Sequence, residues 1–296
     1  MNNPVKVHIA LFAANLIYAA NYTIAKGVMP DYIEPLGFIL LRVSGALLLF
    51  WLFHKMFSAE KVEKRDFWKL ALCELFGVAI NQSLFFKGLN ITTPINAAII
   101  MTSNPILVLL FAAFIIKETI TGKKLIGIVV GITGAVLLIA FGKNFSFGST
   151  TFTGDLLILI NSTSYGIYLV LVKPLMDKYS PLTVIKWVFF FGFLFVLPFG
   201  FMEFTQIDWK EMPLNIWMSV LFVVIATTFI AYSLNIYALK HVSPTIVSYY
   251  VYLQPLLATA IALFLSKDEL SLIKIVSALF IFVGVYLVSS SKPVQR

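Results

Sequence analysis

Charged residues are scarce in this chain of 296 residues, because Asp, Glu, Lys and Arg together make up only 12% of it. Soluble globular domains carry about 25% of these residues, and they place them on the surface that faces water. So small a share excludes an ordinary soluble protein of this size. The chain also lacks a long hydrophilic stretch that would form a separate soluble domain.

Cysteine is nearly absent as well, since Cys73 is the one cysteine in the sequence. A single thiol excludes a disulfide framework and a zinc site built from cysteine pairs. The three histidines, His8, His54 and His241, are far apart along the chain. With no HExxH, P-loop, GxGxxG or DDxxD motif, we expect no metal, no cofactor, no ATP-driven motor within the chain and no enzymatic activity.

Hydrophobic residues are what the chain has in abundance. They form 60% of the sequence, with 28 Phe and a mean hydropathy of +0.93. An α-helix needs about 20 apolar residues to cross a bilayer, and runs of this length recur along the whole chain, which predicts an all-α polytopic membrane protein in contact with the lipid bilayer. The ten expected transmembrane helices cover residues 7–28, 35–56, 68–89, 95–116, 123–142, 154–176, 182–202, 214–238, 245–265 and 270–289.

Lysine and arginine are divided unevenly between the two sets of loops that these spans define. Of the 22 Lys and Arg residues, 15 fall on the side that holds both termini and 6 on the other side, while Arg42 lies within a span. Cytoplasmic loops carry the excess of positive charge in membrane proteins. We therefore expect a multi-pass protein of the cell inner (plasma) membrane with both termini cytoplasmic. The same rule accounts for the net charge of +8 without nucleic acid as a partner.

The second half of the sequence repeats the first. A shift of 150 residues aligns Pro94, Pro105, Lys117 and Gly134 with Pro244, Pro255, Lys267 and Gly284. Nearer the start of each half, a shift of 147 residues pairs Tyr18 with Tyr165 and Lys26 with Lys173. Prolines, a lysine and a glycine that keep one spacing indicate an internal duplication. The predicted repeats are residues 1–145 and 150–296, each with five helices.

An odd number of spans in each repeat means that the second repeat inserts upside down. Two inverted five-helix repeats are typical of secondary transporters, which bind a small-molecule substrate near the bilayer midplane between the halves. Two alternatives stay open. A membrane-embedded enzyme would need clustered acids or a metal site, which the sequence lacks, and a non-transporting membrane subunit would be expected to bring a larger extramembrane region.

Two prolines are expected to kink the fourth and ninth spans near the middle of the bilayer. Pro105 and Pro255 each remove one backbone hydrogen bond and free the carbonyl four residues earlier. A free carbonyl at this depth persists only against protein or a wet cavity. The amides of Asn104 and Gln254 directly precede the prolines and are suited to recognise a polar substrate. A plain kink packed on neighbouring helices is the other interpretation.

Further polar side chains within the spans are candidates for a substrate cavity, although hydrogen bonds between helices are their more common use. Asn81 and Gln82 belong to the third span, and the repeat aligns them with Ala231 and Tyr232 in the eighth. The substrate-cavity candidates are Asn15, Tyr18, Tyr22, Arg42, Asn81, Gln82, Asn104, Tyr165, Tyr232, Asn235, Tyr249 and Gln254.

Arg42 and Glu74 are the ionisable residues that lie well inside predicted spans, where a charge faces the protein interior or water. Arg42 lies about seven residues into the second span from the outer side and Glu74 about six residues into the third span from the inner side, at 1.5 Å per residue. Their long side chains are therefore expected to come within reach of each other, and the favoured interpretation is a structural ion pair between them. The alternatives are that Arg42 anchors a substrate carboxylate and that Glu74 couples transport to protons.

Three glycines, Gly127, Gly131 and Gly134, share one face of the fifth span. Small residues at this spacing let two helices approach closely. The face is expected to serve either as an internal helix contact or as the contact of a homodimer.

Taken in order, these features resemble the EamA branch of the drug/metabolite transporter superfamily. The resemblance covers nearly the whole chain and includes the segments NQSLFFKGL, PINAAIIMTSNPI and FVGVYLV, the Arg of the second helix, and acidic residues after the proline-containing helices, at Glu118 and at Asp268 and Glu269. Lys267 departs from the Gly that more usually precedes the acidic residue. The resemblance implies an exporter of amino acids or related metabolites that works by alternating access, with a cavity lined by helices 1 to 4 and 6 to 9. Substrate identity, direction and ion coupling do not carry over.

Overall fold

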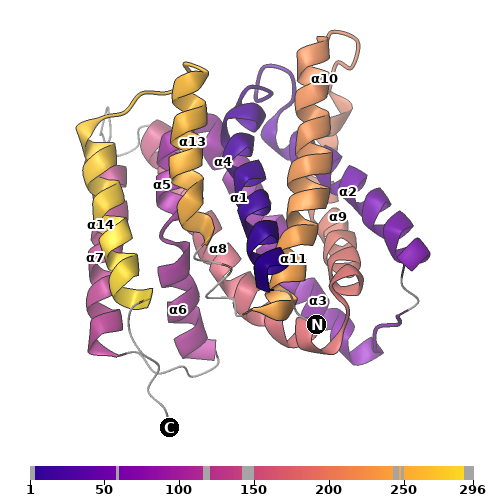
Figure 1. Ribbon diagram of the computed structural model, residues 1–296. Helices are drawn as coiled ribbons and strands as arrows, with labels where there is room; N and C mark the ends of the chain where they lie inside the picture. Colours follow the sequence, from indigo (N-terminus) through magenta and orange to yellow (C-terminus); the bar gives the residue numbers. More distant parts are fainter. Residues whose placement is uncertain are drawn as a thin grey trace.

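The computed structural model describes residues 4–57, 60–115, 121–141, 150–242, 247 and 250–289, and this part of the chain is helical without any β-strand. The helices stand side by side and run between two ends of the molecule (Figure 1). The first residues of α1 and the last residues of α14 lie at the same end, the lower one in Figure 1.

The helices follow the apolar runs of the sequence, with interruptions. In chain order they are α1 (Pro4–Lys26), α2 (Pro35–Phe57), η1 (Lys64–Asp66), α3 (Phe67–Glu74), η2 (Leu75–Ala79), α4 (Ile80–Ile91), α5 (Pro94–Met101), α6 (Asn104–Ile115), α7 (Gly122–Phe141), α8 (Thr150–Lys178), α9 (Pro181–Thr205), α10 (Leu214–Leu221), η3 (Phe222–Ile230), α11 (Ala231–His241), η4 (Tyr250–Tyr252), α13 (Leu253–Phe264) and α14 (Leu272–Ser289).

Two of the helix starts show why the chain turns where it does. Thr93 accepts a hydrogen bond from the backbone N–H of Asn96, and Pro94 occupies the first position of α5. Ser180 caps α9 in the same way, with Pro181 at its first position. A hydroxyl cap followed by proline satisfies the first backbone donors and fixes a helical φ angle.

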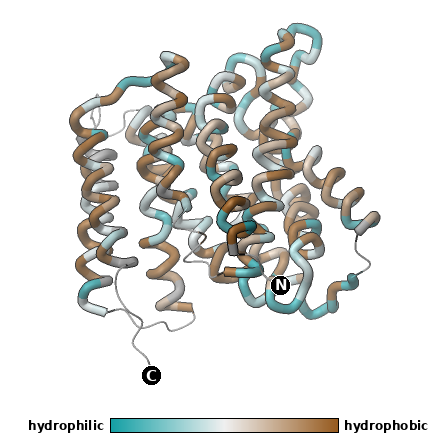
Figure 2. The backbone as a smooth tube through the Cα atoms, in the orientation of Figure 1, coloured by the Kyte–Doolittle hydropathy of each residue, from teal (hydrophilic) through white to brown (hydrophobic). Residues whose placement is uncertain are grey.

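Within the described residues, seven helical segments are long and apolar enough to cross a membrane. They are Val5–Lys26, Pro35–Met56, Lys64–Ile91, Pro94–Ile115, Thr150–Lys178, Pro181–Thr205 and Leu214–His241, and shorter apolar helices cover Leu125–Gly134, Leu253–Phe264 and Leu272–Gly284. Apolar residues dominate the helices, and hydrophilic residues gather at the turns at both ends (Figure 2). The chain is a multi-pass membrane protein, and the count of ten spans stays a prediction.

The fourth predicted span, which the structure places at Pro94–Ile115, is interrupted between α5 and α6. The break falls at Thr102 and Ser103, and Pro105 is the second residue of the new helix. The hydroxyls of Thr102 and Ser103 donate to the carbonyls of Ile99 and Ile100, at 2.6 Å and 2.7 Å. Proline disfavours a helical residue before it but fits a first turn, so the helix restarts. Pro255 likewise lies in the first turn of α13, directly after η4.

The third and eighth predicted spans each contain a π-helical segment. In the first of these spans, η2 separates α3 from α4, and in the other, η3 separates α10 from α11. Wider turns of this kind occur often at functional sites. The helices that follow them, α4 and α11, carry several of the polar side chains described below.

The glycine face of the fifth predicted span is covered within the chain. The helices α7 and α14 pack together, at the left edge of the bundle in Figure 1. A Cβ atom on Gly284 would lie 2.5 Å from the backbone nitrogen of Gly131, and one on Gly134 would lie 2.8 Å from Ile281. The internal contact is therefore the use of this face that the structure contains, and a homodimer stays a prediction without support from it.

Candidate functional site

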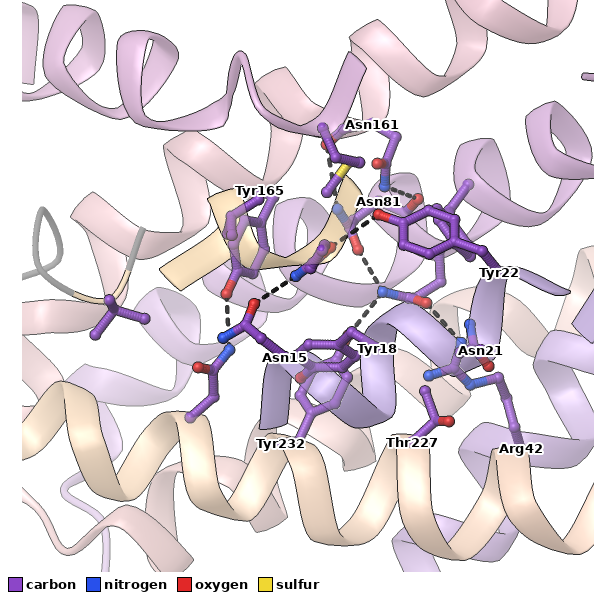
Figure 3. A pocket seen from close by; sticks show the side chains of 17 residues that line it. Asn15, Tyr18, Asn21, Tyr22, Arg42, Asn81, Asn161, Tyr165, Thr227 and Tyr232 are labelled. Atoms are coloured by element: carbon purple, nitrogen blue, oxygen red, sulfur yellow. Dashed lines mark hydrogen bonds between the residues drawn. The ribbon is translucent and has the colours of Figure 1, made fainter. Parts of the chain in front are cut away.

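A polar cavity of about 70 Å³ lies between helices of both halves of the chain. Side chains from α1, α2, α4, α8, η3 and α11 converge on it (Figure 3). Its lining residues are Asn15, Tyr18, Asn21, Tyr22, Arg42, Asn81, Gln82, Phe85, Met101, Asn161, Tyr165, Thr227, Tyr232, Asn235, Val247, Val251 and Gln254. So many amides and hydroxyls inside an apolar bundle need partners, because an unsatisfied polar group away from water costs several kcal/mol.

Most of the residues that the sequence singled out meet at this cavity. Ten of the twelve substrate-cavity candidates line it, and their contact with a substrate stays a prediction. Asn104 does not line it, since its side chain is fully buried and donates to the carbonyl of Ser162 at 3.0 Å. Tyr249 lies outside the described residues.

One wall of the cavity is a hydrogen-bonded junction between α1 and α13. The amide of Gln254 donates to Asn15 Oδ1 at 2.6 Å and accepts from the hydroxyl of Tyr22 at 2.9 Å. Asn15 in turn donates to the carbonyl of Leu11. These bonds fix the orientation of Gln254 and join the first half of the chain to the second.

Arg42 is held in place by neutral partners. Its Nε donates to the hydroxyl of Thr228 at 2.9 Å and its Nη1 donates to Gln82 Oε1 at 2.7 Å. The guanidinium carbon lies 4.9 Å from the centre of the Phe86 ring, which is a favourable position for a cation. Among the described residues that line the cavity, Arg42 alone is charged.

The ion pair that the sequence favoured between Arg42 and Glu74 is not formed. The Glu74 side chain is fully buried against the backbone of Gly192 on α9, whereas Arg42 bonds toward α4 and η3. Gln82, the partner of Arg42, lies roughly two helical turns beyond Glu74 along the same span. Arg42 and Glu74 therefore lie at different depths and face different neighbours.

Asn81 and Asn161 tie α4 to α8 by reciprocal hydrogen bonds. Asn161 Nδ2 donates to the carbonyl of Asn81 at 2.7 Å, and Asn81 Nδ2 donates to the carbonyl of Asn161 at 3.1 Å. A backbone carbonyl only accepts, so the nitrogen of each amide must face it. The other atom of the Asn161 amide, Oδ1, is buried without a partner among the described residues.

Three more acceptors at the cavity share this property. Asn21 Oδ1, Thr227 Oγ1 and Asn235 Oδ1 are also buried without a partner in the described part of the chain, and all three residues line the cavity. Asn235 uses its nitrogen to donate to the hydroxyl of Tyr165 at 3.0 Å. Buried acceptors of this kind are normally satisfied by a ligand, an ion or water.

Thr227 and Val247 were not identified from the sequence as cavity residues. Thr227 lies in η3, and the only signal was a pair of adjacent threonines in an apolar run. Asn21 and Asn161 were visible as asparagines within spans, a common feature of interhelical contacts.

The described residues contain no group of three or more His, Cys, Asp or Glu side chains that could hold a metal ion.

Comparisons with known proteins point to one family. The EamA-like transporter family model matches the chain twice, over residues 5–140 and 152–290. An uncharacterized transporter of Archaeoglobus fulgidus is 27% identical over 97% of this chain and 98% of its own length, and the uncharacterized transporter YyaM of Bacillus subtilis is 22% identical over 94% and 92%. A WAT1-related protein of Arabidopsis thaliana is 25% identical over the whole chain and 84% of its own length.

A solved crystal structure shares the fold at low sequence identity. It superposes with a TM-score of 0.63 at 16% identity, and the match covers 95% of this chain and 98% of that one. Both family matches and the full-length similarity to proteins named as transporters lead to one assignment: the chain belongs to the EamA-like transporter family and is a membrane transporter.

Proposed function

We propose that the protein is a secondary transporter that exports amino acids or related small organic metabolites by alternating access. In this proposal, two inverted five-helix halves cross the inner membrane with both termini in the cytoplasm, and the cargo binds in the polar cavity between them. The observation that carries the proposal is the cavity itself, which combines one fixed guanidinium with unpartnered acceptors and draws its lining from both halves.

Two equivalent lysine contacts support the inverted arrangement. Lys26 at the end of α1 donates to the carbonyl of Leu89 near the end of α4, at 2.8 Å. Lys173 in α8 donates to the carbonyl of Leu239 near the end of α11, at 3.1 Å. The sequence repeat aligns Lys26 with Lys173 and Leu89 with Leu239. The ends of α1 and α11 lie at opposite ends of the bundle (Figure 1), as two inverted copies require.

The centre of the molecule supports the same arrangement. Gln82 donates to the hydroxyl of Tyr232 at 2.7 Å, and these two residues are separated by the repeat shift of 150. Residues at equivalent positions touch each other only near the axis that relates two copies. The cavity therefore surrounds the seam between the halves, where secondary transporters bind their cargo.

The polar groups of the cavity suit a cargo with both an anionic and an N–H donor group. Arg42 has five N–H donors and uses two of them for hydrogen bonds to Gln82 and Thr228. Its other N–H groups are available to a carboxylate. The unpartnered oxygens of Asn21, Asn161, Thr227 and Asn235 accept hydrogen bonds, so they suit an ammonium group. An amino acid carries both groups at a short distance.

The size of the cavity supports a change of conformation during transport. Ligand pockets for organic molecules usually measure about 300–1,000 Å³, whereas this cavity measures about 70 Å³. An organic cargo therefore fits only after the helices around the seam move apart. Such a movement is what alternating access requires.

The proposal is tested by efflux from proteoliposomes loaded with a mixture of labelled amino acids. We expect efflux of at least one amino acid by the wild-type protein and its loss in Arg42→Gln, which removes the charge from the cavity. Arg65→Gln is the matched control, because Arg65 is 76% exposed on η1, and it should retain efflux. The absence of flux for every amino acid and related metabolite from vesicles of folded protein would refute the proposal.

A further inference from the structure

Glu74 is a buried acid with no compensating charge. The residue is 0% exposed, and neither carboxylate oxygen has a hydrogen-bond partner of good geometry among the described residues. The backbone of Ala79, at the end of η2, offers it one weak interaction. An ionised carboxylate in such a place loses its hydration without replacement, which costs several kcal/mol. The packing observed here therefore fits the neutral acid.

The titratable groups that face Glu74 do not supply a cation. Cys73 is its neighbour on α3, Tyr168 approaches from α8 and Tyr232 from α11. From α9 the contact is the backbone of Gly192, and Lys186 on that helix bonds to His54 and stacks on Trp51. Asp66 on η1 is held by Lys69 and Lys178.

The internal repeat shows that the fold does not need an acid at this position. A shift of 150 residues aligns Glu74 with Val224, and a shift of 147 aligns Gly192 with Gly45. Glu74 packs on Gly192, and Val224 packs on Gly45, where a Cβ atom would lie 2.7 Å from Val224 Cγ1. The same helix contact thus occurs twice, with a small apolar side chain in one copy and a carboxyl group in the other. The acid is an addition to a contact that valine satisfies.

Glu74 also lies at a point where the helix can rearrange. It is the last residue of α3, directly before the π-helical segment η2, and η2 packs against α9 and α8. The carboxyl group of Glu74 must be neutral to stay buried. The packing of the α3–η2 segment therefore depends on the proton concentration.

We propose that Glu74 is a reversible proton-binding site whose protonation closes the contact between the α3–η2 segment and α9. When the contact opens, water enters, the carboxyl O–H bond breaks, the proton passes to that water and the carboxylate is hydrated. When the contact closes, the carboxylate takes a proton from water and is buried as the neutral acid. The ligand is the proton itself, so the site does not depend on which cargo the central cavity takes.

Cys73 provides a reporter for this movement. It is the one cysteine of the chain, is 1% exposed and precedes Glu74 on α3. We would measure the rate at which N-ethylmaleimide alkylates Cys73 in the full-length protein in lipid nanodiscs over a range of pH. Each rate is divided by that of the unfolded protein in dodecyl sulfate at the same pH, which corrects for the pH dependence of alkylation at an exposed thiol.

The normalised rate should rise with pH in the wild-type protein as Glu74 ionises and the contact opens. Ordinary coupling between two sites predicts a rise of about 5- to 150-fold. In Glu74→Gln, which is neutral at every pH, the rate should stay low and flat. Repulsion between a Glu74 carboxylate and the Cys73 thiolate would lower the rate instead, so the sign of the change separates opening from simple electrostatics.

Two further variants keep the test decisive. Glu74→Val copies the residue of the second half and should also abolish the pH dependence, which covers the case that the amide of Gln disturbs folding. Glu211→Gln changes an exposed acid and should leave the wild-type profile intact. A flat wild-type profile, or an unchanged rise in both Glu74 variants, would overturn the proposal. No cargo enters this experiment, so its failure is distinct from a failure of the proposed transport activity.

Infrared spectroscopy gives an independent readout of the proton. The carbonyl stretch of a protonated carboxyl group should disappear from the wild-type spectrum as the pH is raised. The part of the band that belongs to Glu74 should be missing at every pH in Glu74→Gln and present in Glu211→Gln. Identical bands in the wild-type protein and in Glu74→Gln would show that Glu74 binds no proton in this range.

Discussion

The two halves of the molecule use equivalent positions for different chemistry. In the first half, Arg42 donates to Gln82. The repeat shifts place Phe189 and Tyr232 at these positions in the second half, and there the two side chains form an aromatic pair with ring centres 5.2 Å apart. Glu74 and Val224 are also at equivalent positions, and there too the first half has a polar group and the second half an apolar one. Charge and amide groups are concentrated in one copy, and aromatic and aliphatic groups fill the other.

This difference indicates that the residues that hold the helices together and the residues that line the cavity are under separate constraints. The helix contacts that hold the bundle occur in both copies, as with the lysines that bond to helix ends and the glycines that admit a neighbouring side chain. In the proposed function, the one guanidinium of Arg42 serves the cargo. Under the proposed duplication, one copy of each site can become apolar without loss of the fold. Substitutions that copy a residue from one half into the other test this explanation.

Arg42→Phe, which copies Phe189, should have the largest effect. The change leaves Gln82 Oε1 and Thr228 Oγ1 without their donor and removes the charge that faces the cargo. Losing one partner of a buried charged hydrogen bond costs about 2–5 kcal/mol, so efflux of the amino acid that the wild-type protein carries best should fall more than tenfold. Efflux at the wild-type rate by folded protein would show that the guanidinium does not serve the cargo.

Alanine at the two equivalent glycines should have the next largest effect, and the effect should be unequal. In Gly45→Ala the new methyl group meets the stiff β-branched side chain of Val224, and overpacking of this kind costs about 1–3 kcal/mol. In Gly192→Ala it meets the end of the Glu74 side chain, which rotates away more easily. Thermal unfolding of both variants in the same detergent should place Gly45→Ala lower, and the reverse order would contradict this account.

Methionine at the two equivalent lysines should have a smaller effect that is also unequal. Lys26 donates to the carbonyls of Leu89, Asn90 and Thr92, whereas Lys173 donates to Leu239 and pairs with Asp177. Hydrogen bonds from a charged donor contribute about 1.5–3 kcal/mol. Lys26→Met should therefore lower the unfolding temperature more than Lys173→Met. Equal shifts would mean that the extra carbonyl contacts add nothing.

Tyr22→Phe should have the smallest effect of this series. It deletes only the hydroxyl that donates to Gln254, at a position where the second half has Leu169. One neutral hydrogen bond contributes about 0.5–1.5 kcal/mol. Transport should persist with a modest rise in the half-saturating concentration of cargo. A complete loss of transport would assign the hydroxyl a direct role at the cargo.

The sequence predicts the outline of the molecule because lipid imposes strong rules on it. Apolar length gives the helices, and polar residues within such helices identify most of the cavity, such as Asn81, Gln82 and Gln254. The offset between neighbouring helices is not encoded so simply. The predicted pair of Arg42 with Glu74 was wrong because Arg42 reaches Gln82, roughly two turns beyond Glu74. The break at Thr102 and Ser103 also escaped prediction, because a proline at mid-span is compatible with a kink as well as with a new helix start.

The π-helical segments η2 and η3 have a consequence for the walls of the cavity. A π-helical turn holds more residues than an α-helical turn, and one residue corresponds to a rotation of roughly 100° about the axis of an α-helix. Conversion of η2 into regular α-helix would turn Asn81 and Gln82 on α4 away from the seam, and the same change in η3 would turn Tyr232 and Asn235 on α11. The π-helical geometry of η2 and η3 therefore decides which side chains of α4 and α11 face the seam.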